Sequence, residues 1–263
     1  MNISRPSLLF ISTCLFLVFL AVSRSASADQ ITLASDPWCP KICFDAKDKP
    51  GYVVEAARSA LGRHGYELRV IELPWSRAIL SVKNGTIDGL LTDPTGDTPG
   101  IILPEHAYFS SIAGYAIHNR AQHSKKLTES DLRKIRFKLI QDYDYSLIPD
   151  FSKIVRNQDD VFYIKGNNAL SRILKIISSG RADATIDDIE ILQYSIDQLN
   201  LTDEFHLSPI SDPIKIYISI SKRRPDAAII AKILSDEIHA MKHDGRIDSI
   251  MSKYRITAKQ TTE

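Results

Sequence analysis

Adjacent carboxylates are the residues of this chain that come nearest to a catalytic pattern. Asp159 is followed by Asp160, and Asp187 is followed by Asp188. Consecutive residues point to different faces of the chain, so neither pair faces one reacting atom as a general acid and base would. The chain also lacks the G-x-S-x-G elbow, the P-loop and the G-x-G-x-x-G turn. We therefore expect a protein that binds a ligand and is not an enzyme.

Two histidines have a spacing that occurs in metal sites. His239 and His243 are four residues apart in a helical pattern, which puts them on one face of the helix. A zincin would need Glu directly after the first histidine, and the chain has Ala240 there. Histidines near the end of a helix are favourable without a metal. We expect neither a metal site nor a cofactor.

A second group of residues lies where α/β proteins bind ligands, after strands and at helix starts. Trp38 follows the first expected strand, and Tyr143 and Tyr145 follow a later one. Trp75 lies beside a helix start, where packing between elements is the alternative to ligand contact. Asn168 is most simply a helix N-cap, although a helix N-terminus that faces a cleft can also hold an anion.

These residues are positioned by a segment that the chain uses twice. Residues 83–92 (KNGTIDGLLT) and 179–188 (SGRADATIDD) each follow apolar residues at helical spacing. In each segment a glycine stands where the helix should end, because Gly adopts the left-handed conformation without strain. A buried strand that ends in polar residues should follow. Ligands bind at the carboxyl ends of such strands, so the two copies predict two sheets that share one cleft.

The remaining pattern predicts two α/β lobes with two crossings between them. Strand and helix patterns alternate up to residue 92, which is typical of a βαβαβ run with parallel strands. We expect the chain to cross at residues 118–126 and to return at residues 208–213. Lobe 1 should then comprise residues 29–117 and 214–256, and lobe 2 residues 118–213. Residues 257–263 should be a disordered tail.

The N-terminus predicts export. Residues 8–22 are apolar, Arg5 precedes them, and Ala26-Ser27-Ala28 fits a cleavage site, so residues 1–28 should be a signal peptide, with an uncleaved anchor as the alternative. Cys39 and Cys43 should then form a disulfide, because a redox or metal pair would need C-x-x-C spacing or a nearby His. The 33 basic and 32 acidic residues are dispersed, which argues against a nucleic-acid partner.

Several segments follow the order and spacing of a known family. They are ITLA at 31–34, Trp38, PGYVVE at 50–55, LPWSR at 73–77, NGTID at 84–88, GRADATIDD at 180–188 and the stretch 241–254. Together they resemble family 3 extracellular solute-binding proteins, the periplasmic polar-amino-acid-binding components of ABC importers. The resemblance covers essentially all of the chain after residue 28. It implies a two-lobed periplasmic-binding-protein type II fold of class α/β, in which helices flank a mostly parallel sheet in each lobe.

The resemblance also implies roles for individual residues. The aromatic that stacks on the ligand in the family corresponds to Trp38. The hydroxyl that binds the ligand's carboxylate corresponds to Thr92 or Thr95. The aspartate that binds the ligand's ammonium group corresponds by spacing to Asp188, with Asp187 as its neighbour.

One departure from the family concerns the ligand's carboxylate. Members that bind α-amino acids usually carry an Arg a few residues after the Thr, which pairs with the carboxylate through two hydrogen bonds. Residues 97–101 contain no Arg here. Arg77 is the alternative source of positive charge if its helix start faces the cleft. In that case Arg77→Ala should lose binding without losing the fold.

We therefore expect a monomeric periplasmic protein that captures a small polar, amino-acid-like solute between two lobes for a membrane ABC permease. Two alternatives remain. One is an enzyme on the same scaffold, such as a cyclohexadienyl dehydratase, which would need a general acid over a leaving group. The other is a sensor that reports the ligand to a separate receptor.

Overall fold

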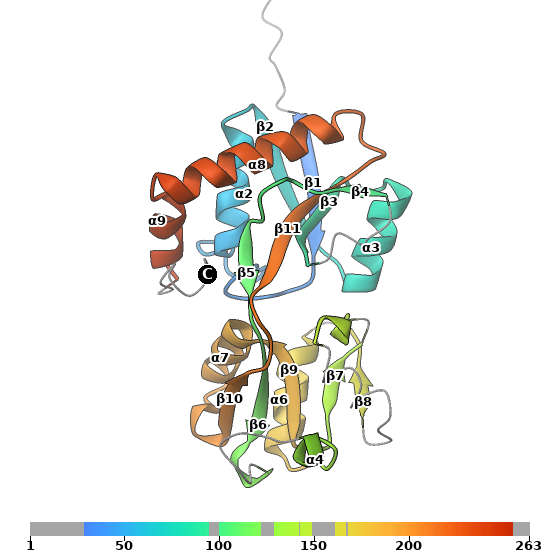
Figure 1. Ribbon diagram of the computed structural model, residues 1–263, viewed down its shortest axis with the longest axis vertical. Coiled ribbons are helices and arrows are strands. Elements are labelled where there is room, and N and C mark those ends of the chain that lie inside the picture. The colour runs from blue at the N-terminus through green and yellow to red at the C-terminus, as the bar shows by residue number, and fades with distance from the viewer. Residues whose placement is uncertain are drawn as a thin grey trace, which may run out of the picture.

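The computed structural model describes residues 29–94, 100–121, 129–141, 143–148, 161–166 and 168–254. The expected signal peptide, Thr95 and the tail at 257–263 lie outside these residues. The described residues form two lobes that lie one above the other (Figure 1). None of their helices combines the length and the apolar character that a membrane span requires.

Lobe 1 is a mixed sheet covered by helices. The strand order is β2-β1-β3-β11-β4, and β5 also pairs with β11. The strands are β1 (Asp29–Ser35), β2 (Tyr66–Glu72), β3 (Gly89–Asp93), β4 (Ile101–Ile102), β5 (Phe109–Ser111) and β11 (Ile214–Ser221). The helices are α2 (Tyr52–Gly62), α3 (Trp75–Asn84), α8 (Ala227–His243) and α9 (Arg246–Ser252).

Lobe 2 contains two small sheets. One has the order β10-β6-β9, and the other pairs β7 with β8 in parallel. The strands are β6 (Ala113–His118), β7 (Lys138–Ile140), β8 (Phe162–Ile164), β9 (Ala184–Asp188) and β10 (Phe205–Pro209). The α-helices are α4 (Glu129–Leu132), α6 (Ala169–Ser178) and α7 (Ile189–Gln198). Short 3₁₀ turns are η1 (Asn119–Ala121), η2 (Tyr145–Leu147) and η3 (Thr202–Glu204).

Each lobe has its own apolar core. In lobe 1, Val53 of α2, Ile218 of β11 and Leu234 of α8 are fully buried in one cluster. In lobe 2, Phe137 and Ile186 belong to one buried cluster. Each lobe is therefore built around its own core.

The first crossing lies at Ile112, earlier than residues 118–126, where we expected it. β5 pairs with β11 in lobe 1, whereas β6 pairs with β9 and β10 in lobe 2. Both strands are largely buried, so residues 108–118 give one continuous strand signal, and only the pairing partner changes at Ile112. Lobe 2 therefore begins near residue 113 and not at residue 118. The chain returns between β10 and β11, within the expected range of 208–213.

The strands next to the hinge run antiparallel to their neighbours. We expected mostly parallel sheets, which holds for β2-β1-β3 and for β7-β8. The sheet β10-β6-β9 is antiparallel throughout, and β11 is antiparallel to β3. The reason is that β6 leaves the hinge while β10 returns to it, so adjacent segments run in opposite directions.

The repeated segment folds as its residues predict. Gly85 ends α3 in the left-handed region, with φ of 71°, and its N–H bonds back to the last turn of the helix. Gly180 follows α6 with φ of 85°, and its N–H donates to the carbonyl of Ile177. β3 and β9 follow these glycines and are buried along their full lengths.

Candidate functional site

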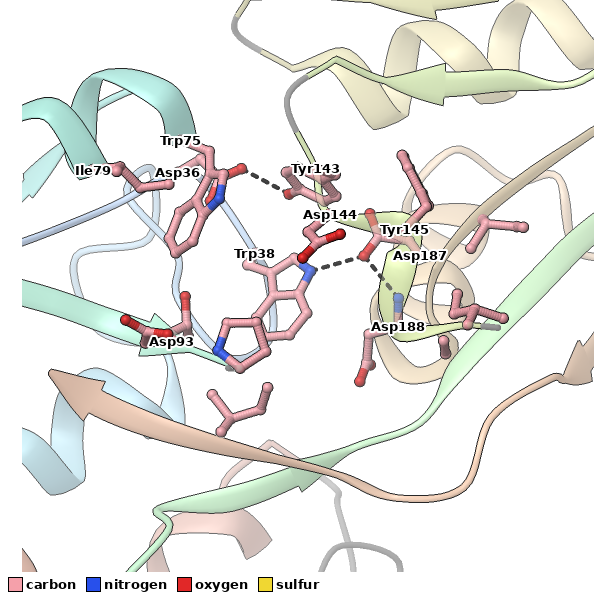
Figure 2. A pocket seen from close by; sticks show the side chains of 16 residues that line it. Asp36, Trp38, Trp75, Ile79, Asp93, Tyr143, Asp144, Tyr145, Asp187 and Asp188 are labelled. Carbon is pink, nitrogen blue, oxygen red and sulfur yellow. Dashed lines mark hydrogen bonds between the residues drawn. The ribbon is translucent and has the colours of Figure 1, made fainter. Parts of the chain in front are cut away.

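The two lobes enclose a cavity of about 390 Å³ at the carboxyl ends of β3 and β9, here called the inner cavity. Figure 2 shows its lining side chains, which come from both lobes. Its aromatic residues are Trp38, Trp75, Tyr143 and Tyr145. Its carboxyl residues are Asp36, Asp93, Asp144, Asp187 and Asp188. This volume lies in the range of small-molecule sites, so the inner cavity is an aromatic and acidic site of ligand size.

A wider groove of about 1030 Å³ lies beside the inner cavity and shares part of its wall; we call it the outer groove. The expected ligand residues divide between the two spaces. Those that line the inner cavity are Trp38, Trp75, Thr92, Tyr143, Tyr145 and Asp188. Those that line only the outer groove are Arg77 and Asn168. Thr95 lies outside the described residues.

Asp187 is a buried carboxyl group, and only one of its two oxygens accepts hydrogen bonds from the described residues. Its Oδ1 accepts hydrogen bonds from Trp38 Nε1 at 2.9 Å and from the Asp188 N–H at 2.7 Å. Its Oδ2 is buried and has no hydrogen-bond partner among the described residues. Burial raises the pKa of Asp187 to about 7; its hydrogen bonds oppose the rise, and the nearby Asp188 and Asp36 add to it. At neutral pH the Asp187 carboxyl group is therefore partly protonated and partly ionised.

Asp36 and Tyr143 join the lobes on another wall of the cavity. Tyr143 Oη donates a hydrogen bond of 2.7 Å to Asp36 Oδ2. Burial raises the pKa of Asp36 to about 6, although the Tyr143 bond opposes this shift. Both residues also line the outer groove, so their hydrogen bond lies where the two spaces meet.

Asp188, expected to bind the ligand's ammonium group, already has a cation within the protein. Lys41 Nζ lies 2.6 Å from its Oδ2. Its Oδ1 caps α7 by accepting from the N–H groups of Glu190 and Ile191, and Ser111 Oγ donates to Oδ2. With its charge balanced and both oxygens bonded, Asp188 serves as an anchor between the lobes. Of these two neighbouring aspartates, Asp187 is the one that has an oxygen without a hydrogen-bond partner among the described residues.

Lys41 crosses from lobe 1 into a buried acidic cluster of lobe 2. Its side chain is 1% exposed. Besides Asp188 it approaches Glu190 Oε2 at 3.5 Å, and Tyr52 Oη donates to the same oxygen at 3.1 Å. The ammonium group also lies 4.6 Å from the ring centroid of Trp38. Lys41 thus pairs with two carboxyl groups of lobe 2 and contacts the face of the Trp38 ring.

The expected disulfide between Cys39 and Cys43 is confirmed, with a Cα–Cα distance of 4.9 Å. It closes the turn that carries both Trp38 and Lys41. Within that turn the N–H of Trp38 donates to the carbonyl of Ile42, and the N–H of Ile42 donates back to Trp38. The disulfide and this bonded pair hold the cavity residue Trp38 and the buried Lys41 in a fixed relation.

Replacing both cysteines by serine should lower the free energy of unfolding by about 2 kcal/mol, because so short a loop loses little entropy when it closes. Urea denaturation of the double variant measures this change. An unchanged stability would mean that the backbone bonds of the turn suffice without the disulfide.

Asn168 and His239, which were considered as ligand or metal residues in the sequence, have contacts within the protein. Asn168 occupies the N-cap of α6, as expected, but it is left-handed with φ of 54° and its side chain makes no capping bond. His239 stacks on His106 and meets His243 edge to face, with ring centroids 4.5 Å apart in each case. In the described part of the chain, no group of three or more His, Cys, Asp or Glu side chains has an arrangement that could hold a metal.

Comparison with known proteins identifies the fold. No family model matches the sequence, and no curated protein matches it. Among solved structures, an ABC uptake transporter substrate-binding protein from Streptococcus pneumoniae with bound histidine matches with a TM-score of 0.70 at 13% identity, over 87% of this chain and 94% of that chain. A mutant of ArgBP from T. maritima matches with a TM-score of 0.69 at 15% identity, over 89% and 98%. The chain has the periplasmic-binding-protein type II fold.

A sensor domain shares this fold as well. A histidine kinase sensor domain with similarity to periplasmic binding proteins matches with a TM-score of 0.68 at 17% identity, over 86% of this chain and 96% of that chain. At such identities the likeness establishes the fold alone. The ligand must therefore be argued from the residues of the cleft itself.

Four carboxyl residues that line the inner cavity, Asp36, Asp93, Asp144 and Asp187, were not among the expected ligand residues. Lys41, which pairs with Asp188, was not expected there either. Asp93 and Asp187 had a signal in the sequence, because each lies at the carboxyl end of the strand in a repeated segment. Asp36 and Lys41 flank Trp38, but no pattern in the sequence gives their partners in lobe 2.

Proposed function

We propose that this chain is an exported solute-binding protein that captures a small polar solute between its lobes and delivers it to a membrane ABC permease. The fold supports this, since a solved example is a substrate-binding protein of an ABC uptake transporter. The inner cavity supports it too, because hinged two-lobed binders close on ligands at this position. Residues 1–28 have the pattern of an export signal.

The observation that carries the proposal is the Oδ2 atom of Asp187 in a cavity lined from both lobes. A buried polar atom without a partner costs free energy. A solute that donates a hydrogen bond to this oxygen removes that cost. We infer that Asp187, and not Asp188, binds the positively charged or hydrogen-bond-donating group of the solute.

The aromatic residues complete the proposed binding mode. Trp38 and Trp75 belong to lobe 1, whereas Tyr143 and Tyr145 belong to lobe 2. Trp38 already contacts Asp187 across the cleft. A solute that stacks on Trp38 and bonds to Asp187 therefore stabilises the closed arrangement of the lobes.

A thermal-shift screen of the purified protein tests solute binding. Amino acids, amines and small acids are added separately, and a solute that binds only the native state should raise the melting midpoint in a concentration-dependent way. Trp38→Ala should weaken binding of that solute by roughly 3- to 30-fold, because the ring face is lost. Tyr163→Ala removes an exposed aromatic and should leave the affinity unchanged. Failure of every solute class to shift the midpoint would refute the proposed function.

We propose that the solute leaves the site unchanged. Mass spectrometry of each stabilising solute after incubation with the protein tests this, and a time-dependent product would favour the alternative of an enzyme on the same scaffold. Uptake measurements in cells test whether the protein delivers the solute to a permease. Cells without this protein should no longer import the solute. Import at the normal rate, with a lost response to the solute, would favour a sensor.

A further inference from the structure

The charges around the inner cavity restrict the kind of solute that it can take. Five aspartates line the cavity, and none of its lining residues in the described part of the chain is Lys, Arg or His. The nearby cation, Lys41, is buried between Asp188 and Glu190, so its charge is already balanced. The described wall of the inner cavity therefore carries carboxyl groups and no basic side chain.

Asp187 and the aromatic rings define what would balance this charge. Asp187 is 6% exposed, and its Oδ2 has no donor among the described residues. In Figure 2, the ring nitrogen of Trp38 points to this carboxyl group, while Asp93 lies on the opposite side of the cavity. Tyr143 and Tyr145 line the same cavity. A carboxylate accepts hydrogen bonds from an ammonium or guanidinium group, and aromatic faces attract the same cations.

A carboxylate on the solute would meet no basic side chain among the described residues of the inner cavity, where the Thr92 hydroxyl is the expected carboxylate ligand that remains. The first amides of α7, which could bind an anion, are taken by the side chain of Asp188. Arg77, the expected carboxylate ligand, lines the outer groove and does not line the inner cavity. A solute carboxylate in the inner cavity would therefore be desolvated beside carboxyl groups, with no cation among the described lining residues to balance it.

We propose that the solute of the inner cavity is an organic cation without a carboxylate group, that is, an aliphatic amine or a guanidino amine and not an α-amino acid. This rests on the proposed solute-binding function. Asp187 receives the cationic group, the Trp38 ring covers it, and the remaining aspartates keep anions out of the cavity.

Calorimetric titration with matched pairs tests the proposal, because the members of each pair differ only in the carboxylate. The pairs are arginine with agmatine, lysine with cadaverine, and ornithine with putrescine. In at least one pair the decarboxylated member should bind about tenfold more tightly or better, since desolvating an unpaired carboxylate opposes binding. An amino acid that equals or exceeds its decarboxylated partner in every pair that binds overturns the proposal and leaves the solute-binding function standing.

Two variants test whether Asp187 binds the cationic group of the solute. Asp187→Asn keeps an oxygen that can accept from Trp38 but removes the charge, and it should weaken amine binding by roughly 10- to 100-fold. Asp236→Asn makes the same change of net charge on the exposed face of α8 and should leave binding unchanged. Thermal melting of both variants verifies that they fold. Equal affinities of Asp187→Asn and the unmodified protein would overturn the assignment.

The variant Arg77→Ala distinguishes binding in the inner cavity from binding that extends into the outer groove. If the solute is an amino acid whose carboxylate reaches the outer groove, this variant should lose affinity for the amino acid but not for its decarboxylated partner, which would contradict our proposal. We expect amine affinity to be unaffected. If neither member of any pair binds, the proposal of an organic cation is wrong. The thermal-shift screen with neutral and acidic solutes then tests whether the protein binds a solute at all.

Discussion

Replacing Lys41 by methionine should destabilise the protein by about 3–5 kcal/mol, because it leaves buried carboxylates without their counter-charge. Methionine approximates the length of the lysine side chain but has no ammonium group. Asp188 and Glu190, both of which approach Lys41 Nζ, would then repel each other in lobe 2. Since Lys41 belongs to lobe 1, the loss should also loosen the contact between the lobes. Urea denaturation measures the first effect, and the radius of gyration in solution scattering measures the second.

The same loop provides a control for this experiment. Lys47 lies six residues later and is exposed, so Lys47→Met should change the free energy of unfolding by less than about 0.5 kcal/mol. Adding Glu190→Gln to Lys41→Met should recover part of the lost stability, because it removes one of the orphaned charges. If Lys41→Met proves as stable as the unmodified protein, the buried ion pairs do not hold the lobes together.

Lowering the pH from 8 to 5 should weaken binding of an organic cation by about 100-fold, because the pKa of Asp187 lies at about 7. A cation binds the ionised carboxylate, so each pH unit below 7 costs about tenfold in affinity. Asp36, with its pKa raised to about 6, should steepen the loss further if it also contacts the solute. Titrations at several pH values measure this dependence. In Asp187→Asn the residual affinity should change much less over the same range.

Stability without ligand should depend on pH in the opposite direction. The pKa of Asp187 is higher in the folded state than its ordinary value of 3.8. The folded state therefore holds this proton more tightly, and stability is lost as the pH rises from about 4 to about 7, by about 1.4 kcal/mol per pH unit for one group. The difference in stability between the unmodified protein and Asp187→Asn isolates this contribution. A constant difference across that range would mean that the pKa of Asp187 is not raised.

Local signals in the sequence were sufficient for the strands that form the cleft. Helical spacing, a glycine stop and an apolar run all lie within about twenty residues, so the repeated segments predicted β3 and β9 and the polar residues at their ends. Local signals did not show which of the neighbours Asp187 and Asp188 caps the next helix and which contacts the other lobe. α7 begins at Ile189, and its first amides draw the side chain of Asp188, which leaves Asp187 to face Trp38.

The crossing between the lobes shows the limit of local patterns. β5 and β6 form one apolar run, and their division at Ile112 follows from pairing with strands far along the chain. The partners of Lys41 and Asp36 are likewise more than a hundred residues away. Nothing in the spacing of these residues identifies such partners, because contacts between lobes depend on how the lobes pack.

The sequence by itself thus determined the α/β elements, the two-lobed arrangement, the short disulfide and the position of a cleft, because each depends on neighbouring residues or on family likeness. Only the tertiary structure decided which aspartate has its charge balanced and which has an oxygen without a hydrogen-bond partner among the described residues. That distinction depends on burial and on one lysine reaching across the cleft, which are properties of the packed lobes and not of any one segment.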